Sequence, residues 1–110
     1  MQDEWILCAA IWYKEIPLKK EIPGVLPINC DIGLVVTGHR HAQCMWTMGC
    51  LTGLRSVTHA PDGVGDYIQG FLTSANRFVD RREAYKIAES RGQLNERTHT
   101  EGCLYSEDLY

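Results

Sequence analysis

The residue types best suited to binding chemistry gather in one short segment, residues 38–44, which reads Gly-His-Arg-His-Ala-Gln-Cys. The segment follows a predicted strand and opens a predicted helix. The first backbone N–H groups of a helix have no partner within the helix, so they can hold an anion such as phosphate. Arg40 adds a guanidinium, which binds phosphate oxygens in pairs. The segment therefore predicts an anion site, with Arg40 and its neighbour His39 as ligand-binding residues.

The same segment offers two other interpretations. His39, His41 and Cys44 are all residue types that bind zinc, but their spacing lacks a matching second pair of ligands. They are also the best candidates for an enzyme that degrades a nucleotide. The sequence contains no phosphate-binding P-loop and no nucleophile elbow, and no histidine is followed two positions on by Ser or Thr. We therefore expect no catalytic residue, no metal and no cofactor, and the remaining alternative is an ordinary surface loop.

A second candidate cluster covers residues 69–78. The ring of Phe71 is of a type that stacks on a nucleobase, and Gly70 would let a ligand approach the backbone closely. Asn76, in the predicted turn that follows, is included among the ligand-binding candidates. The alternative is that Phe71 and Phe78 are core residues on either side of a hairpin.

Asp80 and the arginines after it have two interpretations each. Asp80 is a good N-cap, and Glu83 three residues later completes the pattern of a capping box. Its carboxylate could instead accept hydrogen bonds from a ribose. Arg81 and Arg82, expected to be exposed, stand at the positive end of the helix dipole, an unfavourable place that indicates an external anion or acidic partner. Arg97, in the polar tail, could close over a ligand phosphate or could simply be solvated.

The elements that must position these residues follow from apolar periodicity and turn residues. Apolar, β-prone runs predict strands at residues 5–13, 32–37, 67–72 and 78–79. Helical spacing predicts helices at residues 41–54 and 81–91. In the second helix, Ala84, Ile87 and Ala88 form the apolar face and Gly92 the stop. We predict an α+β fold, with two helices packed on a small, mostly antiparallel sheet, in a single ligand-binding domain over residues 1–110.

Composition limits the function further. The chain has 110 residues, is 45% hydrophobic and 23% charged, and has a net charge of -3. That charge argues against binding to DNA or RNA polymers, and no apolar run is long enough to span a membrane. The acidic first residues do not resemble a signal peptide, so we expect the protein in the host cytosol.

The five cysteines, an odd number without a Cys-x-x-Cys motif, are expected to be free, buried thiols. Because so short a chain buries a modest core, we also expect a homo-oligomer.

Several stretches resemble a widespread group of small phage and prophage proteins. They are residues 8–11, 38–41, 69–73, 76–84, 86–88 and 104–110. Within that group, the chain is similar to the first family of Thoeris anti-defence sponges. Those proteins bind cyclic ADP-ribose isomers and hold them intact in pockets between subunits, and some members also take up cyclic oligonucleotides at separate sites.

The resemblance implies a role for each candidate residue. Phe71 would stack on adenine, Asp80 would face a ribose, and Arg40 and Arg97 would hold the diphosphate. The partners would be a cyclic nucleotide-type small molecule and further copies of the chain. The alternatives are the nucleotide-degrading enzyme described above and a protein–protein inhibitor of host defence.

Overall fold

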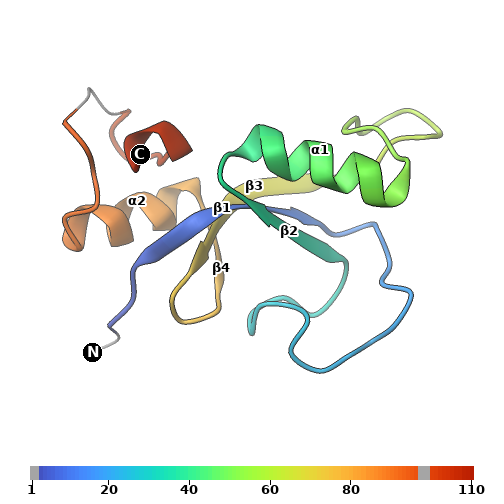
Figure 1. Ribbon diagram of the computed structural model, residues 1–110, viewed down its shortest axis with the longest axis horizontal. Coiled ribbons are helices and arrows are strands. Elements are labelled where there is room, and N and C mark those ends of the chain that lie inside the picture. Colours follow the sequence, from blue (N-terminus) through green and yellow to red (C-terminus); the bar gives the residue numbers. More distant parts are fainter. Residues whose placement is uncertain (1–2, 97–99) are drawn as a thin grey trace.

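The computed structural model describes residues 3–96 and 100–110 and confirms the predicted α+β fold (Figure 1). The elements follow in the predicted order, and their bounds differ from the predicted ones by one or two residues. The strands are β1 (Ile6–Tyr13), β2 (Leu34–Gly38), β3 (Tyr67–Thr73) and β4 (Phe78–Asp80). The helices are α1 (His41–Thr52), α2 (Arg81–Ser90) and the short 3₁₀ helix η1 (Ser106–Asp108).

The four strands form one antiparallel sheet in the order β2-β1-β3-β4. β1 is central, and Ala10 pairs with Thr37 on one side and with Gly70 on the other. Because β1 is covered on both faces, its apolar residues run without alternation, and Ala9 and Ala10, which point to opposite faces, are both fully buried. The continuous apolar run in the sequence is therefore the mark of a central strand.

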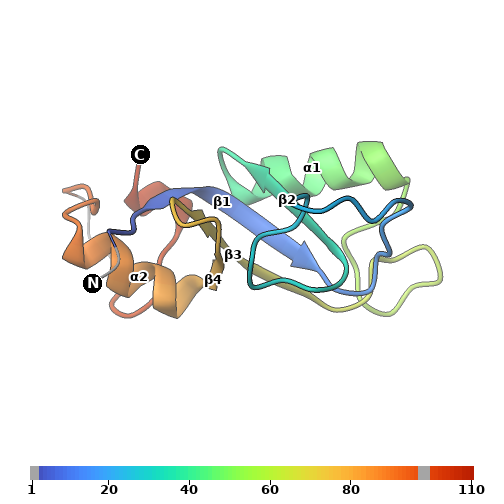
Figure 2. The same cartoon turned by 90° about the horizontal axis from the view of Figure 1, so that it is seen from below.

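The two faces of the sheet are covered differently, and the two helices lie towards opposite ends of the sheet (Figure 2). Both helices lie on one face, where buried residues of β1 and β3 pack against Cys44 and Met48 of α1 and against Ala84 and Ala88 of α2. The other face is covered by the long connection between β1 and β2, which contributes Cys30 and Leu26 to a smaller cluster. One sheet face thus brings the starts of both helices into the same neighbourhood.

The predicted helix signals are confirmed with one correction. Gly53 ends α1 in the left-handed conformation, with a φ of 73°. Asp80 caps α2, but Glu83 does not complete a capping box, because its carboxylate accepts a hydrogen bond from Arg77 at 2.9 Å instead. Within the described residues, no helix is long and apolar enough to cross a membrane.

All five cysteines are free, as predicted, but they are not all buried. Cys30 and Cys44 lie in the core, Cys8 and Cys103 are partly exposed, and Cys50 is exposed on α1. The expectation of buried thiols is wrong for Cys50 because α1 turns this residue away from the sheet.

Candidate functional site

A small hollow forms where the start of α1, the start of α2 and the C-terminal tail meet. Its volume is about 180 Å³. Its lining residues come from segments far apart in the sequence, and two of them are arginines: Arg40, His41, Ala42, Arg81, Tyr105, Ser106 and Glu107. We call it the arginine pocket. It lies at the start of α1, where residues 38–44 predict an anion site; Arg40 of that prediction lines it and His39 does not.

Arg40 is the N-cap residue of α1 and has an extended backbone, with φ -134° and ψ 163°. A guanidinium carries only donors, so Arg40 cannot accept hydrogen bonds from the first N–H groups of the helix. Its own backbone N–H donates to Gln43 Oε1 at 2.8 Å. Its guanidinium turns towards the tail, where Nη1 lies 3.4 Å from Ser106 Oγ and 3.5 Å from Glu107 Oε2. The helix start therefore lacks a side-chain cap and has a cation beside it.

Arg81 supplies the second guanidinium. It donates to Leu104 O at 2.8 Å and to Gln69 Oε1 at 2.6 Å, and it lies 4.4 Å from the centre of the Tyr105 ring. Among residues 3–96 and 100–110, no carboxylate forms an ion pair with it. Burial lowers the pKa of the Arg81 guanidinium, although an arginine stays protonated. The predicted exposure of Arg81 is wrong, because the tail around Leu104 covers it and leaves it half-buried.

His41 forms a rigid wall of the pocket. Its Nε2 lies 2.8 Å from Gly70 O, so this nitrogen carries the proton and donates it to the carbonyl. The ring packs edge-on against Phe71, with the ring centres 5.1 Å apart. Burial, and then the charge of Arg81, lower the pKa of His41 and keep it neutral at neutral pH. A neutral, hydrogen-bonded imidazole supports the site without adding charge.

The last residue of the chain packs beside the pocket. The Tyr110 ring stacks on His39 with the ring centres 4.3 Å apart, and its hydroxyl donates to His39 O at 2.7 Å. Arg40 donates to the Tyr110 carbonyl. His39 and Arg40 are therefore brought together with the tail, which the sequence did not predict.

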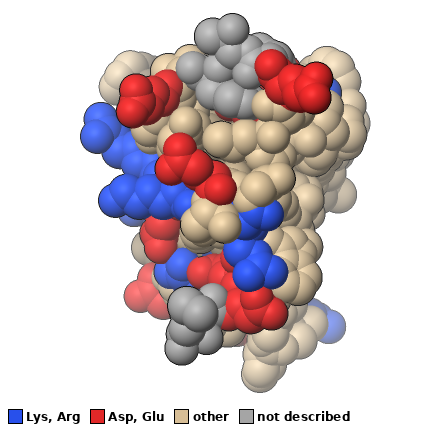
Figure 3. Space-filling model, turned by 90° about the vertical axis from the view of Figure 1, so that its left-hand side faces the viewer, with Lys and Arg blue, Asp and Glu red and all other residues tan. Residues whose placement is uncertain are grey.

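The surface around α2 and the tail mixes charges of both signs (Figure 3). Lysine and arginine side chains alternate with aspartate and glutamate across this end of the molecule. A protein that binds a nucleic-acid polymer commonly presents a continuous basic face instead. The positive charge of the site is thus local, which suits a small anion.

Comparison with known protein families gives a match over nearly the whole chain. The family model described as "Phage T4 y16D protein" matches residues 5–110. The chain belongs to this phage protein family. The match covers all strands and helices of this y16D-family chain and every residue of the arginine pocket. Neither the curated proteins nor the solved structures gave a match. The expected membership of a small phage protein family is thereby confirmed.

The second predicted cluster of this y16D-family chain serves the core. Phe71 is fully buried, which agrees with the alternative that it flanks a hairpin within the core. A Cβ atom at Gly70 would lie 2.1 Å from Val79 O, so the close neighbour that requires glycine is β4 and not a ligand. Asn76 is exposed in the turn between β3 and β4, with a φ of 58°. None of these residues lines the arginine pocket.

Asp80 acts as the predicted helix cap. Its Oδ1 accepts hydrogen bonds from the backbone N–H groups of Arg82 at 3.0 Å and of Glu83 at 2.9 Å. This contact explains the residue without a ribose, and Asp80 does not line the pocket. Arg97, the other candidate for the diphosphate, lies outside the described residues.

The three residues of the metal and enzyme alternatives each have a separate structural contact. His39 stacks on Tyr110 and His41 donates to Gly70, as described above. Cys44 is fully buried, with its Sγ 3.7 Å from Ala9 O, and burial raises the pKa of its thiol to about 11. In the part of the chain that the structure describes, no group of three His, Cys, Asp or Glu side chains is placed to hold a metal ion.

Four residues of the pocket lie outside the predicted segment 38–44: Arg81, Tyr105, Ser106 and Glu107. The sequence carried a signal for Arg81, because an arginine in the first turn of a helix opposes the dipole. It carried none for the tail residues, since nothing local indicates that residues 105–107 return to the start of α1.

Proposed function

We propose that this phage protein is an anti-defence sponge that acts in the host cytosol. It binds a cyclic ADP-ribose-type immune signal and sequesters it without cleaving it. The arginine pocket is the part of the protein that receives the diphosphate of the signal. Arg40 and Arg81 hold the phosphate oxygens, and the first N–H groups of α1 add further donors.

The observation that carries the proposal is the meeting of two guanidiniums at an uncapped helix start. Arg81 is half-buried and its hydrogen bonds go to neutral oxygens, so its charge is not neutralised by a direct ion pair within the described residues. A partly desolvated cation of this kind gains most from an anion that enters beside it. Tyr105 adds an aromatic face next to the same guanidinium, 4.4 Å from it.

The size of the pocket supports an oligomer. Pockets for ligands of nucleotide size measure about 300–1,000 Å³, whereas the arginine pocket measures about 180 Å³. One chain would therefore enclose only the phosphate part, and a second copy would cover the bases and riboses. The outer face of α1 offers apolar surface for such a copy, since Trp46 is 67% exposed and Leu51 is 73% exposed.

Binding without cleavage is favoured by the state of the candidate catalytic groups. His41 is neutral and bonded to a carbonyl, and the thiol of Cys44 is buried with a raised pKa, so it is a poor nucleophile. A nucleotide-degrading enzyme and a protein–protein inhibitor remain the two other classes of function that the experiment must distinguish.

Incubation with cyclic ADP-ribose isomers separates the three classes. The protein is mixed with each isomer, freed of unbound ligand, and heat-denatured, and the released material is analysed by chromatography. A sponge releases intact ligand, an enzyme yields a product, and a protein–protein inhibitor takes up nothing. Release of a product, or no uptake of any isomer, would overturn the proposal.

Two adjacent arginines provide a matched pair of variants for this experiment. Arg81→Gln removes the half-buried guanidinium, whereas Arg82→Gln removes the same charge from an exposed position one residue away. A hydrogen bond to a charged group contributes about 1.5–3 kcal/mol, so Arg81→Gln should weaken binding by about tenfold or more. Arg82→Gln should leave binding unchanged. Equal losses in both variants would show that only overall charge matters.

A further inference from the structure

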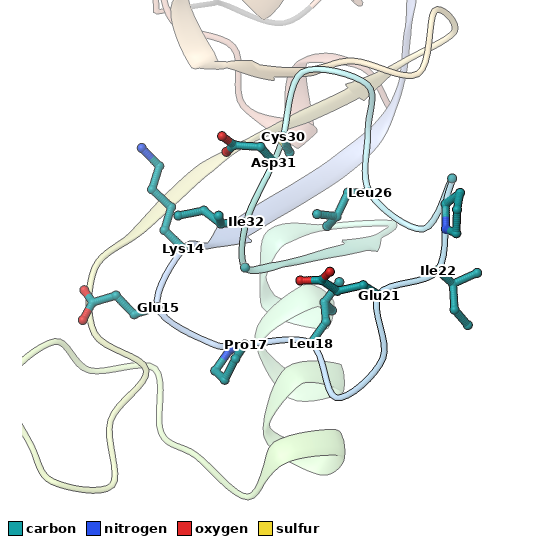
Figure 4. A pocket seen from close by; sticks show the side chains of 13 residues that line it. Lys14, Glu15, Pro17, Leu18, Glu21, Ile22, Leu26, Cys30, Asp31 and Ile32 are labelled. Carbon is teal, nitrogen blue, oxygen red and sulfur yellow. The ribbon is translucent and has the colours of Figure 1, made fainter.

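A second hollow, larger than the arginine pocket, lies away from it, inside the connection between β1 and β2 (Figure 4). We call it the loop hollow. Its volume is about 740 Å³, it is open to solvent, and all its lining residues fall within residues 14–33. No residue of the arginine pocket contributes to it.

The connection is held at its two ends. Ile16 is buried near the end of β1. Near the start of β2, the side chain of Asn29 donates to Phe78 O at 2.6 Å and accepts from Phe78 N–H at 2.8 Å. Between these anchors, the described structure has one backbone–backbone hydrogen bond within residues 17–26, from Val25 N–H to Ile22 O. Residues 17–26, which we call the arch, therefore pack little against one another and surround the loop hollow.

The inside of the arch combines apolar walls with negative charge. Leu18 and Leu26 point into the ring, and the carboxylate of Glu21 points in between them (Figure 4). Asp31 adds a second carboxylate to the lining. Among the described residues, neither Glu21 nor Asp31 forms an ion pair.

The other two charged residues of the lining already have partners. The carboxylate of Glu15 accepts a hydrogen bond from Asp66 N–H at 2.6 Å. The ammonium of Lys14 lies 4.6 Å from the centre of the Trp12 ring, where a cation–π contact holds it. Glu21 and Asp31 thus give the lining of the loop hollow a negative charge that Lys14 does not neutralise by a direct contact. Lys19 and Lys20, which precede Glu21 in the chain, do not line the hollow.

Apolar side chains continue from the hollow onto the surrounding surface. They are Ile22, Val25, Ile28 and Ile32, each more than half exposed. Clustered exposure of this kind marks a surface that another protein covers, because a small molecule in the hollow would leave most of it in water.

We propose that the loop hollow is a docking site for a segment of another protein in which a lysine or arginine stands between aliphatic residues. The aliphatic stem of such a side chain packs against Leu18 and Leu26, and its charged end reaches Glu21. The flanking aliphatic residues cover the exposed isoleucines. This site is separate from the arginine pocket and takes the opposite charge.

The test uses a fluorescein-labelled peptide of alternating leucine and lysine, with a leucine–glutamate peptide as the charge control. Fluorescence anisotropy measures the affinity of the whole protein for each peptide. The leucine–lysine peptide should bind, and the leucine–glutamate peptide should not. Glu21→Lys should weaken binding of the first peptide at least tenfold, and Ile22→Ser should also weaken it. Amide NMR shifts on binding should concentrate in residues 17–33.

Matched variants decide whether the effect is local. Glu89→Lys makes the same charge change at an exposed position on α2, and Leu7→Ser removes an exposed apolar side chain on β1, away from both proposed sites. Both should bind the peptide like the wild type. Equal weakening by Glu89→Lys, equal binding of the two peptides, or NMR shifts confined to α1 would overturn the proposal. Spermidine, a small amine, serves as a competitor. If spermidine displaces the peptide, and the peptide itself causes no NMR shifts at Ile28 and Ile32, the hollow binds a small amine and the proposal is overturned.

Discussion

The two helices of this protein begin in opposite ways. α2 starts at Asp80, whose carboxylate accepts two backbone N–H groups, and Glu83 in its first turn pairs with Arg77. α1 starts at Arg40, which carries donors only, and its first turn contains no acidic residue. The start of α2 is thus satisfied by the chain itself, whereas the start of α1 has no side-chain cap among the described residues and lines a pocket with two guanidiniums. A helix start that is left uncapped beside cations is a place where an external anion can supply the missing acceptor.

The comparison also shows how the open start is kept in place. Without a cap, α1 depends on tertiary contacts: His41 donates to Gly70 and packs on Phe71, and Arg40 reaches Ser106 and Glu107. In the proposed function, these contacts would hold the donors in place before a ligand binds, which would lower the ordering cost of binding. The carboxylate of Glu107, 3.5 Å from Arg40, stands near the place that a ligand phosphate would take.

Removing the support beneath α1 should have the largest effect. Phe71→Ala deletes a fully buried ring that packs against His41. Large-to-small changes of this type cost about 3–5 kcal/mol, which urea unfolding would measure. Phe71→Leu, which retains most of the apolar volume, should cost less. A Phe71→Ala protein of wild-type stability that binds its ligand tenfold more weakly would instead assign the ring to base stacking.

Giving the uncapped start of α1 an acidic cap, like that of α2, should abolish the proposed ligand binding. Arg40→Asp gives α1 an acceptor cap like that of α2 and replaces a cation with an anion. We expect affinity for the bound cyclic ADP-ribose isomer to fall by at least about 100-fold, or about 2.8 kcal/mol, by calorimetry. Arg82→Asp makes the same charge change at the exposed first turn of α2 and should bind normally. A similar loss in both variants would remove the distinction between the two helix starts.

Removing the cap at the start of α2 should lower the stability of the protein without changing its ligand affinity. Asp80→Ala removes the cap of α2 and should lower the free energy of unfolding by about 1 kcal/mol. Asp80→Asn keeps an acceptor oxygen and should cost less. Because Asp80 lies outside the arginine pocket, ligand affinity should not change in either variant. Loss of affinity in Asp80→Ala with unchanged stability would restore the ribose contact that the family resemblance implies.

The smallest expected effect is on stability and concerns the ion pairs that Arg77 forms with Glu4 and with Glu83 in the first turn of α2. Arg77 joins Glu83 to the buried Glu4, with Nε and Nη2 each 2.9 Å from a Glu4 oxygen. The hydrogen bond from Arg77 lowers the pKa of Glu4 below its ordinary value of 4.5. A lowered pKa gives stability that is present above pH 4.5 and is lost as pH falls below it.

Urea unfolding across pH tests this contribution. Wild-type stability should exceed that of Glu4→Gln at neutral pH, and the two curves should converge as pH falls through the acidic range. Parallel curves between neutral pH and acid would show that Glu4 does not titrate as the structure implies.

Much of the fold could be read from local features of the sequence. Three features act over only a few residues: the continuous apolar run of β1, the glycine that ends α1 and the aspartate that caps α2. Each can therefore be recognised in the sequence alone. The same is true of the strand–helix boundary in residues 38–44, where Arg40 is the N-cap residue of α1. Arg81 was already marked by its unfavourable place at a helix start.

What only the tertiary structure decided is the fate of side chains whose surroundings come from elsewhere in the chain. Phe71 has the composition of a stacking platform, yet helix packing on one face of the sheet buries it completely. Glu83 fits a capping box, yet Arg77 takes its carboxylate. Residues 104–107 look like an ordinary tail, yet hydrogen bonds between Leu104 and Arg81 return them to the start of α1. Periodicity records which way a residue faces along its own element, but not which distant segment it will meet.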